Sequence, residues 1–309
     1  MRLFEAAHRR ATHAGPLGPV ERPLLAIGLV LLAHLVFVAA DGASKHLTTD
    51  MSTPQIVWLR YGIVVLLLVP VVWYRRAEHP FRTTQPALHL LRGMMIVASS
   101  VLFVWALQHL PLELCTAIGF VSPFFVTALS VPFLGESVGV RRWVAVGLGF
   151  VGVLLILRPS GVAFQWPMLL PLMSSFCWAV SLILIRRMRG SERALTIMVY
   201  SSLVGWIASA PLALPLWRPP DAFEWLLLTA IASFSALGQY LVIHAFIMAS
   251  ASTLAPFSYS SILWAVLIGL LVFGTFPDAP TLAGTSILIG AGLYVWHRER
   301  VRATSATGG

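Results

Sequence analysis

Three charged side chains fall inside long apolar stretches of this 309-residue chain: Asp41, Lys45 and Arg60. Asp41 precedes Lys45 by four residues, which places an acid and a base on one helix face in the favourable order. Arg60 follows Pro54 by six residues, about 9 Å into a helix at 1.5 Å per residue. Charges at such positions are costly and usually serve binding or transport. These residues are therefore the first candidates for recognising a charged group.

Each of these charges also has a purely structural interpretation. Asp41 and Lys45 could form a salt bridge at the membrane edge, with Lys45 extended toward water, and for Lys45 we favour this interpretation. Arg60 stays charged and needs a carboxylate or carbonyl partner. With Asp41 it could form an outer gate, grip a substrate carboxylate, or make a permanent ion pair. Transport that survived Arg60→Ala at an unchanged protein level would exclude the gate.

Two histidines lie in similar apolar surroundings, His34 in mid-stretch and His244 near the end of another stretch. A titrating histidine could relay protons. A histidine hydrogen-bonded within a helix interface is the commoner arrangement, so we favour packing and leave proton coupling open. No spacing in the sequence predicts a metal site or a cofactor site.

Aromatic and proline residues supply the other candidates. Several aromatic side chains lie deep in apolar stretches, and a few of them are expected to line a cavity although lipid or core contact is commoner for any one. The candidates are Trp58, Trp105, Trp178, Tyr240, Tyr259 and Trp264. Pro123 and Pro256 interrupt such stretches and have serine or threonine hydroxyls nearby, which is typical of a hinge, a cavity wall or a tolerated kink.

The composition indicates what must position these residues. Hydrophobic residues make up 58% of the chain and charged residues 11%, with a mean hydropathy of +0.84, whereas soluble domains carry about 25% charged residues. This composition excludes a soluble globule, a disordered chain, collagen and a soluble coiled coil. It predicts an all-α integral membrane protein.

Uncharged stretches of membrane-spanning length, the third of them between Arg92 and Glu113, predict ten transmembrane helices. The stretch between Glu224 and Asp278 is long enough for two, divided at residues 249–253. With ten spans, sixteen arginines fall on the side of both termini and only Arg158 and Arg218 on the other. Basic residues favour the cytoplasmic side. We therefore expect cytoplasmic termini in a bacterial inner membrane, and attribute the net charge of +9 to topology and not to nucleic-acid binding.

The helix boundaries repeat at an offset of 139 residues. The turn at residues 108–113 maps onto 247–252, and the helix end at Arg158 maps onto His297. Each repeat has five helices, so the second enters the membrane upside down, as in many secondary transporters. The predicted domains are an N-terminal tail (1–22), two repeats (23–158 and 159–298) and a C-terminal tail (299–309).

The first repeat also carries the residues of a known family. They are Lys45, Arg60, Ala106-Leu107, Pro111, Ala117, Pro123, Leu134-Gly135-Glu136, Gly147, Gly149 and Gly152. With these residues the chain resembles, over about residues 24–300, two EamA-type domains of the drug/metabolite transporter superfamily. In the second repeat Thr275 replaces Glu136 and Ile262 replaces Pro123, so the resemblance implies no symmetric role for that pair.

The resemblance implies ten helices around a central cavity and export of amino acids or related metabolites. We therefore expect a secondary transporter and not an enzyme, working by alternating access on amino acids that include aromatic or hydrophobic ones. The alternatives are an uptake permease, for example for S-adenosylmethionine, and a membrane-embedded enzyme. The expected partners are a small-molecule substrate and the lipid bilayer, with the chain acting as a monomer.

Overall fold

The computed structural model describes residues 23–75, 79–135, 139–157, 165–188, 190–249, 254, 257 and 260–307. Within these ranges every regular element is a helix. The first repeat contains α2 (Pro23–Leu47), α3 (Thr53–Tyr74), α4 (Pro86–His109), α5 (Leu112–Gly119), α6 (Ser122–Leu134) and α7 (Val140–Leu157). The second contains η2 (Trp166–Met168), α8 (Leu169–Arg187), α9 (Ala194–Ala213), η3 (Leu214–Leu216), α10 (Ala222–Met248), α12 (Ser260–Phe273) and α13 (Ala279–Thr307).

The described helices account for the ten expected spans. Seven are long and apolar enough to cross a bilayer, with α5 and α6 together forming one of them. Three shorter apolar helices, Val146–Leu157, Ser260–Phe273 and Ala279–Ala291, occupy the places of the other three. The chain is therefore a multi-pass helical membrane protein. The N-terminal tail lies outside the described residues, and α13 continues to Thr307 through most of the expected C-terminal tail.

Local sequence signals set several of the helix ends. Pro54 stands in the first turn of α3, where a missing backbone N–H costs nothing. Gly135, with φ of 68°, ends α6 in the left-handed conformation that glycine tolerates best. Asp221 and Glu224 begin α10 as a capping box, each side chain accepting a hydrogen bond from the other residue's backbone N–H at 2.8 Å.

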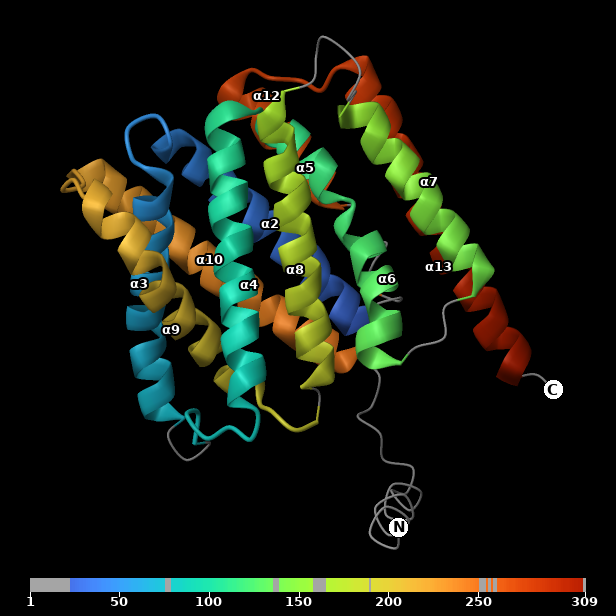
Figure 1. Ribbon diagram of the computed structural model, residues 1–309, viewed down its shortest axis with the longest axis horizontal. Coiled ribbons are helices and arrows are strands. Elements are labelled where there is room, and N and C mark those ends of the chain that lie inside the picture. The colour runs from blue at the N-terminus through green and yellow to red at the C-terminus, as the bar shows by residue number, and fades with distance from the viewer. Residues whose placement is uncertain are drawn as a thin grey trace, which may run out of the picture.

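The two repeats have matching helices and opposite directions. Shifting α6 by 139 residues gives 261–273, against an observed α12 of Ser260–Phe273, and α4 maps onto α10 in the same way. Helix packing follows the same symmetry, because α10 packs on α2 and α3 while α4 packs on α8 and α9. Figure 1 shows α2 rising from the lower face of the molecule and α8 descending toward that face. The fold is thus a pair of inverted repeats.

Helices α7 and α13 pack against each other at the edge of the molecule (Figure 1). The contact depends on two glycines that face each other, Gly152 on α7 and Gly284 on α13. A Cβ atom on Gly284 would lie 2.6 Å from the backbone oxygen of Gly152. Gly152 and Gly284 therefore serve close packing within one chain.

A hydrogen-bonded clamp joins the α3–α4 loop to the α8–α9 loop. The Glu192 carboxylate accepts from the Thr83 hydroxyl at 2.8 Å and from the Thr84 N–H at 2.9 Å. His89 Nε2, fully buried, lies 3.3 Å from the second Glu192 oxygen. The symmetry-related contact joins the α2–α3 and α9–α10 loops, where Arg218 donates to the Asp50 carbonyl at 2.9 Å and pairs with Glu224.

The Glu192 clamp predicts a pH-dependent contribution to stability. Burial alone raises the pKa of the Glu192 carboxyl, but the hydrogen bonds from Thr83, Thr84 and His89 outweigh it and hold the pKa below its ordinary value. A carboxyl whose pKa is lowered on folding stabilises the protein above its unfolded-state pKa of about 4.3 and loses that effect as pH falls through the folded value. Glu192→Ala should therefore cost about 1–3 kcal/mol at pH 7.

Thermal unfolding of purified protein in detergent at pH 7 and near pH 4 measures this effect. The gap in melting temperature between wild type and Glu192→Ala should narrow at the lower pH. Thr49→Ala, which removes an exposed hydroxyl outside the clamp, serves as the control. An equal gap at both pH values would contradict the role given to the carboxylate.

Candidate functional site

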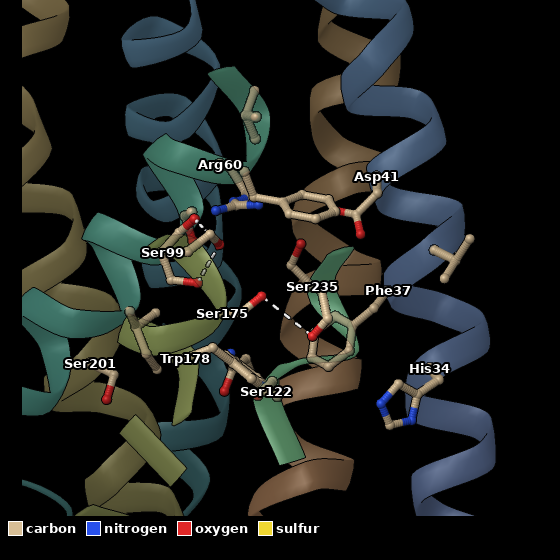
Figure 2. Close-up of a pocket in the computed structure, with 18 of the residues that line it drawn as sticks. His34, Phe37, Asp41, Arg60, Ser99, Ser122, Ser175, Trp178, Ser201 and Ser235 are labelled. Atoms are coloured by element: carbon tan, nitrogen blue, oxygen red, sulfur yellow. Dashed lines mark hydrogen bonds between the residues drawn. The ribbon is translucent and has the colours of Figure 1, made fainter. Parts of the chain in front are cut away.

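A cavity of about 240 Å³ lies between the two repeats. Its walls come from α2, α3, α4, α8, α9 and α10, from the α5–α6 break and from the start of α12. Figure 2 shows side chains from these helices converging on one space, with His34, Phe37 and Asp41 along α2 on one side. The volume suits a small metabolite.

Pairs of adjacent serines supply much of the polar wall. Ser99 and Ser100 lie on α4, Ser174 and Ser175 on α8, and Ser201 and Ser202 on α9, all lining the cavity. The Ser99 and Ser174 hydroxyl oxygens are 3.0 Å apart, and Ser174 also donates to the Ser99 carbonyl at 2.8 Å. The hydroxyls can rotate, so the wall can donate hydrogen bonds to a ligand or accept them.

The break between α5 and α6, which together form the fourth span, opens onto this cavity. α5 ends at Gly119 and α6 begins at Ser122, so Pro123 stands in the first turn of α6 and not inside a continuous helix. Gly119, Phe120 and Ser122 line the cavity. Ser175 donates to the Gly119 carbonyl at 3.3 Å. A hydroxyl from another helix thus satisfies one backbone group that the break frees, as expected for interrupted membrane helices.

Asp41 and Arg60 both line the cavity. Arg60 is 8% exposed and lies close enough to Asp41 for the two charges to interact. Figure 2 shows both side chains extending toward the same end of the cavity. The Arg60 guanidinium also lies 5.2 Å from the Tyr61 ring centre, within reach of a cation–π contact. Opposite charges from α2 and α3 therefore meet at one end of the site.

Lys45 does not belong to the cavity wall. Its ammonium donates to the carbonyls of Leu107 and Leu110, at 3.1 and 2.7 Å, where α4 ends. A cation at a helix C-terminus satisfies carbonyls that have no partner within the helix. Lys45 therefore joins α2 to the end of α4.

The two histidines differ in their access to the cavity. His34 lines it and its Nδ1 lies 2.8 Å from the Val30 carbonyl, one turn earlier on α2. That contact assigns the proton to Nδ1 and leaves Nε2 as an acceptor. His244 packs against Tyr240 with ring centres 4.3 Å apart, outside the cavity wall.

Of the six aromatic candidates, the structure places Trp178 in the cavity. It packs edge-to-face on Phe37 at 5.9 Å, and both rings line the space. Trp58 packs on Trp217 and Trp105 on Trp166, both outside the lining. Tyr240 is 47% exposed, and Trp264 packs in the hydrophobic core. Tyr259 and Pro256 lie outside the described residues.

Arg92 is the main cavity residue that the sequence interpretation missed. The count of uncharged residues predicts a third span that begins after Arg92. That boundary is wrong, because α4 begins at Pro86. Arg92 lines the cavity and is 1% exposed. It follows Pro86 by six residues, as Arg60 follows Pro54, so the same depth rule would have found it. The serine doublets are a second signal that could have been used.

Within the described ranges, no cluster of three or more histidine, cysteine, aspartate or glutamate side chains could hold a metal ion. The polar groups that line the cavity among the described residues are hydroxyls, guanidinium groups, an amide, the His34 imidazole and the Asp41 carboxylate, which suit a polar organic ligand. An all-helical membrane protein with inverted repeats around such a cavity has the architecture of a secondary transporter.

The comparisons with known proteins agree with this class. The model of the EamA-like transporter family matches residues 24–158 and 165–296. The chain belongs to this family and is a membrane transporter. A solved crystal structure shares the fold with a TM-score of 0.62 at 17% sequence identity, covering 86% of this chain and 94% of that one.

Three relatives differ in what their names say they carry. An S-adenosylmethionine uptake transporter of Rickettsia bellii is 30% identical over 89% of this chain and 94% of its own length. A riboflavin transporter of Vibrio cholerae is 30% identical over 91% and 97%. A pseudopaline exporter of Pseudomonas aeruginosa is 28% identical over 85% and 93%. The family therefore includes both uptake and export, and the relatives leave the substrate and the direction open.

Proposed function

We propose that this protein transports a small metabolite with an α-amino-acid head group and a flat ring, with S-adenosylmethionine as the first candidate. One observation carries the proposal: the cavity places one carboxylate, Asp41, among the guanidinium groups of Arg60 and Arg92. A zwitterionic head group presents an ammonium to the acid and a carboxylate to a guanidinium. The Phe37–Trp178 pair offers apolar ring surface to the rest of such a substrate.

The similarity to S-adenosylmethionine uptake transporters supports this candidate. S-adenosylmethionine has the amino-acid head group and a flat adenine ring. Riboflavin has a flat ring but no carboxylate and no ammonium, so it would leave the charged end of the cavity unmatched. A substrate with both charges matches the carboxylate and the guanidinium groups of the site.

Export of aromatic amino acids is the second candidate. These substrates have the same head group, and the rings of Phe37 and Trp178 would pack on theirs. We place the protein in a bacterial inner membrane with both termini cytoplasmic, on the basis of the arginine distribution. Residues from both repeats of one chain line the cavity, which supports a monomer working by alternating access around it.

Counterflow in sealed proteoliposomes tests the proposal independently of direction. Vesicles loaded with unlabelled S-adenosylmethionine, phenylalanine or riboflavin are diluted into a trace of the same labelled compound, and accumulation of label reports exchange. We expect accumulation with one of the two amino-acid compounds and none with riboflavin. Accumulation with riboflavin alone would overturn the proposal, and chemical conversion of the label would indicate an enzyme.

A further inference from the structure

Arg92 is a buried cation without a carboxylate partner. One of its terminal nitrogens donates to the Ser201 hydroxyl and the other lies 3.4 Å from the Gln239 amide oxygen. Its Nε, also buried, has no hydrogen-bond partner among the described residues. No carboxylate of the described residues forms an ion pair with it. A guanidinium stays charged in a protein, so this site has a positive charge that only neutral groups contact.

Arg60 is in a different electrostatic environment. Asp41 lies near it and offsets its charge, and the Tyr61 ring lies beside it. Within the part of the chain that the structure describes, Arg92 is thus the cavity arginine without an opposite charge nearby. A buried charge of this kind is strongly disfavoured unless an anion pairs with it.

We propose that Arg92 is the residue that binds the substrate carboxylate and so selects for substrates that carry this group. The inference rests on the proposed function, because it assigns one end of the amino-acid head group to a particular residue. The carboxylate accepts hydrogen bonds from the guanidinium, including the free Nε–H, and the charge of Arg92 is neutralised only while substrate is bound. Arg60 then acts with Asp41 at the other charged end.

The geometry gives Ser201 and Gln239 a positioning role. Arg92 extends from α4 of the first repeat, whereas Ser201 and Gln239 belong to α9 and α10 of the second. Ser201 itself donates to the Ile197 carbonyl at 2.7 Å, which orients its oxygen toward the guanidinium. Figure 2 shows Ser201 on the side of the view away from Asp41 and Arg60. An anion at Arg92 therefore binds at the junction of the two repeats, where alternating access changes their contact.

The test removes the guanidinium group from the protein and the carboxylate group from the substrate. The proteins reconstituted in liposomes are wild type, Arg92→Gln and the matched control Arg60→Gln. The labelled compound is the one that wild type exchanges, S-adenosylmethionine or phenylalanine. Competition is measured with the same compound and with its analogue lacking the carboxylate, decarboxylated S-adenosylmethionine or phenethylamine. Wild type should prefer the carboxylate compound by about 10- to 100-fold, the range expected for one charged hydrogen-bond contact.

Arg92→Gln should lose most of this preference, with both compounds competing about equally and weakly. Arg60→Gln should bind both compounds less well and keep the preference. A preference that persists in Arg92→Gln and disappears in Arg60→Gln would overturn the inference while leaving the proposed function intact. Wild-type protein that exchanges neither amino-acid compound would overturn the proposed function itself, and the inference with it.

A second variant keeps the test valid if Arg92→Gln is poorly folded. Arg92→Lys retains the charge but replaces the planar fork by a single ammonium, and it should keep part of the preference. Melting temperatures in detergent give an independent measurement, because the carboxylate compound should stabilise wild type more than its decarboxylated analogue. Equal stabilisation by the two compounds in wild type would overturn the inference.

Discussion

Replacing Arg60 with glutamine should reduce counterflow by about 10- to 100-fold and lower the melting temperature. Arg60 is 8% exposed and lies beside Asp41 in the cavity wall. Removing the guanidinium leaves the carboxylate of Asp41 without a nearby cation in a poorly solvated space. Asp41→Asn should have a similar effect, because it leaves Arg60 without its acid.

The double variant Asp41→Asn/Arg60→Gln separates the role of these residues in substrate binding from their role in stability. It removes both charges, so the melting temperature in detergent should return most of the way to that of wild type. Counterflow should stay low, since the substrate ammonium has lost its carboxylate. A double variant that transports like wild type would show that the two residues form only a structural ion pair. Arg60→Lys, which preserves the charge, serves as the control and should retain both stability and part of the activity.

Most of the fold could be predicted from the sequence because rare charges mark the helix ends of a membrane protein. The lack of a polar surface excluded a soluble fold, and the boundaries at an offset of 139 residues predicted the inverted repeats. Where the rule failed, it did so at Arg92. Counting uncharged residues places the start of the third span at Arg92, because this count cannot tell a buried cation from one at the membrane interface.

The candidate site was only partly predictable, since spacing along a helix gives the depth of a residue but not the direction in which it faces. Asp41, Arg60, His34 and Trp178 line the cavity. Lys45 has the expected depth and instead contacts the end of α4, one helix away. Among the aromatics, Trp105 and Tyr240 are 40% and 47% exposed on the outer surface. Helical periodicity was of little help, because in a bilayer the outward face is as apolar as the core.

The two loop clamps and the Lys45 contact join different pairs of helices. The Glu192 clamp joins loops next to α4 and α9, which pack on each other, and the Arg218 clamp joins loops next to α3 and α10, which also pack on each other. Each clamp therefore reinforces an existing helix pair. The Lys45 contact is different, because it joins α2 to the end of α4, and both helices belong to the first repeat. Movement of one repeat against the other would act on the two clamps, which cross between the repeats, and not on the Lys45 contact.

Replacing Gly284 with alanine should destabilise the protein by about 1–3 kcal/mol, the usual cost of overpacking. Its added Cβ would lie 2.6 Å from the Gly152 backbone oxygen, which cannot move without displacing α7, and 2.5 Å from Ile156 Cγ1. Gly290→Ala is the matched control on the same helix, because a Cβ there meets nothing within 4 Å. Alanine also raises helix propensity at both sites, so only the contact with α7 distinguishes the two variants.

Thermal unfolding in detergent and counterflow should respond differently to these substitutions. Gly284→Ala and the reciprocal Gly152→Ala should lower the melting temperature, while Gly290→Ala should leave it unchanged or raise it slightly. No described residue of α7 or α13 lines the cavity, so the folded fraction of each variant should keep the substrate preference of wild type. Equal melting temperatures for Gly284→Ala and Gly290→Ala would show that α7 and α13 do not depend on this contact. A changed preference would instead couple the α7–α13 pair to the cavity, which the packing of these two helices at the edge of the molecule does not predict.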